Sequence, residues 1–228
     1  MTIGRAIVAC EVFRPELQSL LGGNMDRCYF LPQGLHRQPG LLRRTLQGII
    51  DGLDANACVH TILFAYGLCG KGLDGIRSLK SRLIVPHSED CIAVLHGVKA
   101  FHCPSQVDRT GTYYLSAGWI RYGSDAYKEY RRCLTFLDND EAFWAAKEMI
   151  RHYRRFAVID TGLPSLRDDC SYARTVAEFF GLDYAETRGS TDWLVKLLES
   201  PATDRLGEEF VAAGPEHRLT PGMFYRCV

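Results

Sequence analysis

Apolar runs alternate with amphipathic stretches along most of the chain. Short apolar runs at 6–12, 28–32, 60–67 and 82–86 predict strands, and the stretches between them predict helices. The clearest helical stretch, 39–53, begins with proline, a residue common in the first turn of a helix. This alternation predicts an α/β fold with a mainly parallel sheet flanked by helices.

The second half of the chain continues the pattern after an expected linking loop at 103–112. Its predicted elements are an extended segment at 112–120, helices at 125–137 and 140–153, a strand at 156–162, a helix followed by a strand within 171–187, and a helix at 190–200. A short helix is also expected near 73–80 in the first half. We therefore expect either two similar α/β lobes, residues 1–105 and 106–228, or one continuous domain.

Composition narrows the class of protein. The 228 residues are 46% hydrophobic, enough for a sizeable core, and 27 basic side chains balance 27 acidic ones. This balance gives no argument for a nucleic acid or an anionic membrane as partner, so we expect a small-molecule substrate or cofactor. No apolar run is long enough to span a membrane, and nine cysteines without a secretion signal favour a reducing compartment. These features predict a cytoplasmic protein.

Three cysteines follow predicted strands. Cys10 ends the first strand, Cys69 follows the strand at 60–67, and Cys91 follows the strand at 82–86. The carboxyl ends of parallel strands share one edge of a sheet, where sites are commonly built, so the three thiols are expected to meet. The alternative is that each thiol is only a small buried hydrophobe.

Three converging thiolates suit a soft or borderline metal. A [4Fe-4S] iron–sulfur cluster held by three cysteines keeps one iron open to substrate. Zinc would instead take a fourth ligand, such as His36, His87, Glu11 or a water molecule. The sequence leaves both cofactors open.

The segment "LFAYGLCGKGLDG" surrounds Cys69 with glycines. Glycine lets a bulky group approach the backbone, and consecutive N–H groups can hold an anion, so Gly67, Gly70 and Gly72 are candidate cofactor-binding residues. The spacing is not that of a phosphate-binding P-loop.

Other candidates could handle protons or form a pocket. His36 and His87 lie on predicted loops, and Asp90 either joins them in proton transfer or only caps the helix that follows. Tyr113 and Trp119, in the aromatic segment 113–122, form either one wall of a ligand pocket or a core between two lobes.

Six blocks occur in a characteristic order: "ACEVFRPEL", "LPQGLH", "FAYGLCGKGL", "VPHSEDCI", "GTYYLSAGWI" and "VIDTG". With them the chain resembles the family named domain of unknown function 1638 over roughly residues 5 to 200. The family pattern includes cysteines that match Cys10, Cys69 and Cys91 and a histidine that matches His36. Members occur in anaerobic bacteria and methanogens, often encoded near corrinoid-dependent methyltransferase systems. The resemblance therefore implies a shared metal or cluster site and a link to one-carbon or methyl-transfer metabolism.

Three functional hypotheses follow from these observations. In the first, an enzyme acts on a small molecule at an open metal position, with His36, His87 or Asp90 moving protons. The second is a carrier or maturation protein that delivers a metal or cofactor to a partner of a methyltransferase system without turnover. The third is a protein whose cysteines only pack in the core. The reaction and the oligomeric state stay open.

Overall fold

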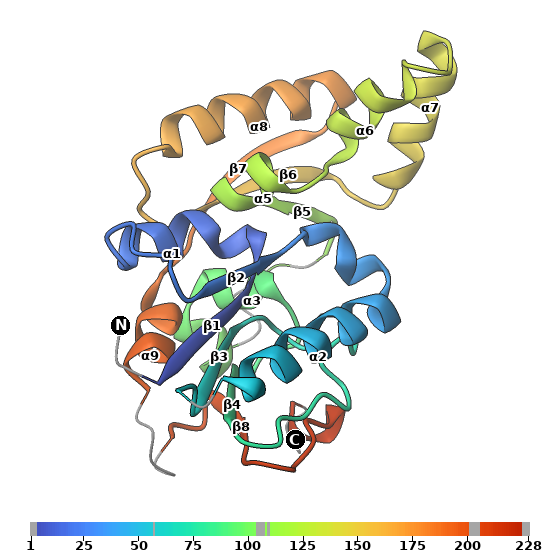
Figure 1. Ribbon diagram of the computed structural model, residues 1–228. Coiled ribbons are helices and arrows are strands. Elements are labelled where there is room, and N and C mark those ends of the chain that lie inside the picture. Colours follow the sequence, from blue (N-terminus) through green and yellow to red (C-terminus); the bar gives the residue numbers. More distant parts are fainter. Residues whose placement is uncertain (1–3, 57, 104–107, 109, 201–205, 225–228) are drawn as a thin grey trace.

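The structure is a computed structural model that describes residues 4–56, 58–103, 108, 110–200 and 206–224. Helices and mainly parallel strands form two regions, each built on its own sheet (Figure 1). The α/β class predicted from the alternation is confirmed. Much of the expected linker at 103–112 lies outside the described residues.

The first sheet has five strands in the spatial order β2, β1, β3, β4, β8. They are β1 (Arg5–Cys10), β2 (Cys28–Leu31), β3 (Thr61–Ala65), β4 (Arg82–Pro86) and β8 (Phe210–Ala213). The first four run parallel, and β8 pairs antiparallel with β4 at one edge. Strands β1, β3 and β4 are buried almost throughout, as expected of central parallel strands that are covered on both faces.

Helices cover both faces of this sheet. They are α1 (Arg14–Leu20), α2 (Pro39–Ala55), α3 (Cys91–His96), α4 (Val98–His102) and α9 (Asp192–Glu199), with short 3₁₀ turns η1 (Glu11–Phe13), η2 (Gln33–Arg37) and η4 (Pro221–Met223). Helix α2 buries Leu42, Leu46 and Ile50, which its periodicity places on one face. Helix α9 packs against β3 and β4, on the other side of the sheet from α2 (Figure 1). No helix of the described chain combines the length and apolar character needed to cross a membrane.

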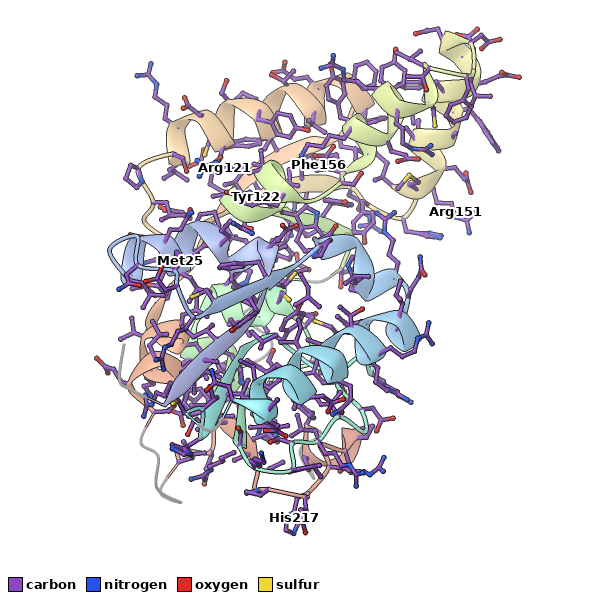
Figure 2. The ribbon with its side chains drawn as sticks, viewed as in Figure 1. Met25, Arg121, Tyr122, Arg151, Phe156 and His217 are labelled. Atoms are coloured by element: carbon purple, nitrogen blue, oxygen red, sulfur yellow. The ribbon has the colours of Figure 1, made fainter. Side chains whose placement is uncertain are left out.

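The second region has a three-stranded parallel sheet in the order β5 (Thr112–Leu115), β6 (Arg155–Asp160), β7 (Asp183–Arg188). Its helices are α5 (Ala117–Tyr122), α6 (Ala126–Cys133), α7 (Asn139–Met149) and α8 (Leu166–Phe180). The central strand β6 is buried on both faces: Phe156 (Figure 2) and Val158 join the core under α8, whereas Ala157 and Ile159 join the core of the first region. The two cores are therefore in contact.

The chain returns to the first region after the second sheet. Helix α9 and strand β8 both pack with the first sheet, although they belong to the expected second lobe, 106–228. The pairing of β8 with β4 spans more than a hundred residues of sequence, and a local hydrophobic pattern cannot reveal it.

The short helix predicted near 73–80 is wrong. Gly75 has φ of +82°, which cannot continue a right-handed helix, and Arg77 forms a bridge with Arg218 instead. The buried carboxylate of Asp54 fixes the segment further, since it accepts hydrogen bonds from the Ser78 hydroxyl at 2.6 Å and from the Leu79 N–H at 2.7 Å. Tertiary hydrogen bonds replaced the local helical preference here.

Candidate functional site

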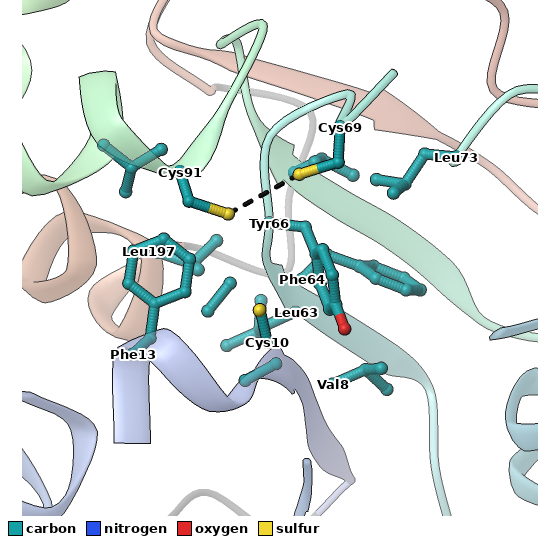
Figure 3. Close-up of a cluster of buried hydrophobic side chains, with 14 of the residues drawn as sticks. Val8, Cys10, Phe13, Leu63, Phe64, Tyr66, Cys69, Leu73, Cys91 and Leu197 are labelled. Carbon is teal, nitrogen blue, oxygen red and sulfur yellow. Dashed lines mark hydrogen bonds between the residues drawn. The ribbon is translucent and has the colours of Figure 1, made fainter. Parts of the chain in front are cut away.

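Three cysteines meet at the carboxyl edge of the first sheet. Cys10 is the last residue of β1, Cys69 lies in the loop after β3, and Cys91 opens α3 after β4. All three are buried, line one cavity of about 180 Å³, and direct their sulfur atoms toward a common space (Figure 3). The structure thus brings together the three thiols that the strand ends predicted.

Hydrogen bonds between two loops set the position of Cys69. The Leu68 N–H donates to the Ser88 carbonyl at 2.8 Å, and the Cys69 N–H donates to the Glu89 carbonyl at 2.9 Å. These bonds continue the side-by-side course of β3 and β4 beyond the strands. As a result the Sγ atoms of Cys69 and Cys91 lie 3.5 Å apart.

Gly67 makes this close approach possible. A Cβ at this position would lie 2.6 Å from the backbone of Asp90, closer than real Cβ contacts allow. Gly72 has a similar packing role, because a Cβ there would lie 2.4 Å from Leu42 on α2. Of the three glycines predicted to bind a cofactor, only Gly70 lines the cavity. Gly67 and Gly72 serve the packing of the protein itself.

The turn that carries Cys69 has an unusual backbone. Cys69 has φ of +47° and Gly70 has φ of +63°, both in the left-handed region. A non-glycine residue in that region costs roughly 1–2 kcal/mol. Backbone strain of this kind is typical of functional sites, because the surrounding structure must hold it in place.

The thiols influence one another's protonation. A hydrogen bond from Cys91 lowers the pKa of Cys10 in spite of burial, which opposes the shift. Hydrogen bonds with Cys10 and with Cys69, in that order of effect, raise the pKa of the Cys91 thiol well above its usual range. Burial of Cys91 adds to this effect. Cys10 is therefore the member of the pair that loses its proton first.

Tyr66 is a member of the site that the sequence did not single out. Its side chain is 2% exposed and lines the cavity, and its hydroxyl has no hydrogen-bond partner among the described residues. Burial, and after it the negative charge of a nearby Cys10 thiolate, raises the pKa of Tyr66 well above its usual range, so the hydroxyl keeps its proton. Its position directly after β3, at the same strand end as Cys69, was the available signal.

His36 and Trp119 lie where the thiol cavity adjoins an outer cavity of about 420 Å³. Their ring centres are 6.1 Å apart, and His36 comes from η2 whereas Trp119 comes from α5 of the second region. Tyr113 lines only the outer cavity. The predicted aromatic wall is thus divided between the two cavities.

His87 and Asp90 have different surroundings. The ring of His87 does not line the thiol cavity; its Nδ1 lies 3.0 Å from the Glu208 carbonyl oxygen and its ring packs on Phe101. Asp90 lines the cavity and also caps α3, where its Oδ1 accepts a hydrogen bond from the Ala93 N–H at 2.9 Å. Asp90 therefore caps helix α3, which was the alternative to a role in proton transfer. A role for His87 in proton transfer at the thiols has no geometric support.

The arrangement of ligands is incomplete for a metal ion as the side chains lie. Among the described His, Cys, Asp and Glu residues, no group of three or more is arranged to hold one. The cavity does contain the right donor atoms, namely three thiol sulfurs together with His36 and Asp90 on its walls. Zinc and an iron–sulfur cluster both stay predictions.

Comparison with known proteins adds one match. The family model described as "Protein of unknown function (DUF1638)" matches residues 30–198, which include His36, Cys69 and Cys91 and begin after Cys10. No curated protein and no solved structure matches the chain significantly. The match covers well over half of the sequence, so the chain belongs to the DUF1638 family.

Proposed function

We propose that Cys10, Cys69 and Cys91 bind one soft metal ion, which holds a small molecule in the cavity beside them. The observation that carries this proposal is the convergence of three buried thiols, from three strand ends, on one cavity. Thiolates are preferred ligands of zinc and other soft or borderline metals. We place this function in the cytoplasm, where thiols stay reduced.

The spacing of the thiols favours a single ion over a cluster. Two sulfurs bound to one tetrahedral zinc, each at about 2.3 Å, are separated by about 3.8 Å. The Cys69 and Cys91 sulfurs, at 3.5 Å, are close to this separation. Cysteines of an iron–sulfur cluster bind different irons and lie further apart, so a cluster needs larger side-chain movements. A single ion needs the Cys10 sulfur, which lines the same cavity, to join the pair that Cys69 and Cys91 already form.

Three protein ligands leave a fourth position for a small molecule, which a bound metal ion can polarise as a Lewis acid. The Tyr66 hydroxyl is available to donate a hydrogen bond to that molecule. His36 is available to accept a proton. Its Nδ1 lies 2.6 Å from the Gln33 carbonyl oxygen, which can only accept, so Nδ1 carries the hydrogen and Nε2 is the basic nitrogen of the neutral ring.

Metal analysis of anaerobically purified protein tests the proposal. We expect about one metal ion per chain in the wild type, and none in Cys69→Ser, which keeps the size of the side chain but replaces the soft ligand. Cys170→Ser is the matched control, since Cys170 lies on α8 of the second region, away from the cavity. It should keep the full metal content.

Two results would contradict the assignment. The first is full metal content in Cys69→Ser; the second is a wild type that binds neither zinc nor iron after anaerobic reconstitution. Strong visible absorption with several irons per chain would instead identify an iron–sulfur cluster and overturn the single-ion geometry.

A carrier that delivers a metal or cofactor to a methyltransferase system is the second candidate. The thiol cavity shares His36 and Trp119 with the larger outer cavity, which gives cargo a route to the surface. A carrier should release its metal to a competing chelator within minutes in the folded state. An enzyme should retain the metal through many turnovers.

A further inference from the structure

A separate cavity, of about 370 Å³, is lined by four arginines. Arg43 and Arg44 come from α2, Arg77 from the loop that precedes β4, and Arg218 from the segment after β8. Asp51 is the only carboxylate among the described residues that line it. His217, which precedes Arg218 in the sequence, lies at the end of the molecule opposite the second region (Figure 2). The chain as a whole has no net charge, so this concentration of positive charge is local.

Backbone and side-chain hydrogen bonds hold the segments that carry these arginines. Gln47 on α2 accepts from the Arg77 N–H at 3.1 Å and donates to the Arg77 carbonyl at 2.8 Å. The Leu219 N–H donates to the Ile76 carbonyl at 3.0 Å. The Leu219 carbonyl accepts a hydrogen bond from the Gly75 N–H at 2.8 Å. The three segments that carry the arginines are therefore held in fixed positions relative to one another.

The positive charges of this cavity are poorly balanced within the protein. Arg77 and Arg218 face each other directly in an antiparallel bridge, an arrangement that is unfavourable for like charges. Arg43 has a partner in Asp74 at 3.4 Å. In the part of the chain that the structure describes, Arg44, Arg77 and Arg218 make no ion pair. A bound anion would relieve this repulsion.

We propose that this cavity binds a small anion that carries at least two phosphate groups. A guanidinium group presents a planar pair of N–H donors that matches phosphate oxygens, and it keeps its charge at every physiological pH. With Arg43 paired to Asp74, the three remaining groups still exceed what the one carboxylate among the described lining residues, Asp51, can pair. Three of the four arginines, Arg44, Arg77 and Arg218, are exposed, and with Arg43 they border one compact hollow, which favours a small ligand over an extended nucleic-acid strand. Leu79, 56% exposed at the same cavity, is placed to contact an organic part of the ligand.

Calorimetric titration with pyrophosphate and, separately, with adenosine diphosphate tests this proposal at about 0.15 M salt, where weak surface attraction is largely screened. We expect saturable binding of one molecule per chain. The double variant Arg77→Gln/Arg218→Gln should weaken binding at least about tenfold, since each lost charge-assisted hydrogen bond contributes to affinity. Equal affinity for both probes identifies the diphosphate group as the recognised part, and tighter binding of adenosine diphosphate adds the organic part.

The matched control is Arg131→Gln/Arg167→Gln. These arginines are exposed on α6 and α8 and their loss changes the net charge by the same amount. The control should bind both probes like the wild type. Three results would overturn the proposal: no saturable binding of either probe, an equal loss of affinity in the control, or tighter binding of a single-stranded RNA than of either probe. Each result is independent of whether the thiols bind a metal.

Discussion

The two sheets of this protein share an architecture but differ at their carboxyl edges. The first sheet presents three thiols and the Tyr66 hydroxyl to a cavity. At the ends of β5 and β6 in the second, the polar groups are used by the chain itself: the Ser116 hydroxyl accepts from the Trp119 N–H at 3.2 Å to cap α5, and an Asp160 carboxylate oxygen accepts from the Gly162 N–H at 2.8 Å. Similar topology therefore does not imply similar chemistry, and the uncommitted groups mark the first sheet as the candidate site.

The second region contributes a wall to that site. Helix α5 carries Trp119 to the thiol cavity, and Gly118 lets α5 approach η1 directly after Cys10. A Cβ on Gly118 would lie 1.9 Å from the carbonyl oxygen of Val12. The contact between the regions therefore depends on the absence of one methyl group.

Breaking this contact is the largest effect that we expect. Gly118→Ala should destabilise the protein by about 3 kcal/mol or more, because the new methyl group meets backbone atoms that cannot move aside independently. Gly48→Ala is the matched control: it lies inside α2 with open space around it, and the better helix propensity of alanine should add up to about 1 kcal/mol of stability. Urea unfolding of both variants provides the measurement. A Gly118→Ala protein as stable as the wild type would show that the regions do not meet as described.

A buried carboxyl between the regions gives a smaller, pH-dependent effect. Glu16 on α1 is fully buried, and one oxygen accepts from the Thr161 hydroxyl at 2.9 Å, at the end of β6. Burial raises the pKa of Glu16 from 4.5 to about 7, with a small opposing effect of nearby hydrogen bonds. The raised pKa means that the folded state favours the protonated form. The resulting stability is full below about pH 4.5 and is lost as the pH rises through 7.

Glu16→Gln should remove this dependence. The variant should match the wild type near pH 4 and exceed its unfolding free energy at pH 8 by up to about 3 kcal/mol, the value of the shift at about 1.4 kcal/mol per pKa unit. Asp168→Asn, an exposed carboxylate on α8, should leave the pH profile unchanged. A wild-type stability that does not fall between pH 5 and 8, relative to Glu16→Gln, would contradict the buried position of this carboxyl.

The sequence predicted the parts of this comparison that depend on local pattern. Apolar runs of strand length identified β1, β3 and β4, and the rule that parallel strands share a carboxyl edge was sufficient to bring Cys10, Cys69 and Cys91 together. This inference needed no information on the distance between the segments.

Features that depend on long-range packing were not predictable in the same way. Strand β8 and the segment before it decide where His87 lies, since the imidazole contacts the Glu208 carbonyl. The need for a glycine at position 67 comes from the backbone of Asp90, which lies opposite it in the fold. The segment at 73–80 lost its expected helix to the same kind of contact, through the bridge between Arg77 and Arg218.

The smallest effect that we expect concerns the turn that carries Cys69. The two regions differ in which residues occupy turns of this kind. In the second region, turns with positive φ are occupied by glycine, at Gly162 and Gly181, whereas Cys69 and Lys71 hold positive φ values of +47° and +69° in the first. Lys71→Gly should relieve strain of about 1 kcal/mol, partly offset by the greater freedom of glycine in the unfolded chain, for a net gain of about 0.5 kcal/mol. Cys69→Gly should relieve the same strain but also remove a buried thiol and its contact with Cys91, so its gain in stability should be smaller or absent. If Cys69→Gly is instead as stabilising as Lys71→Gly, the contact of the thiol with Cys91 does not compensate the strain at Cys69, and the two loops alone hold the turn.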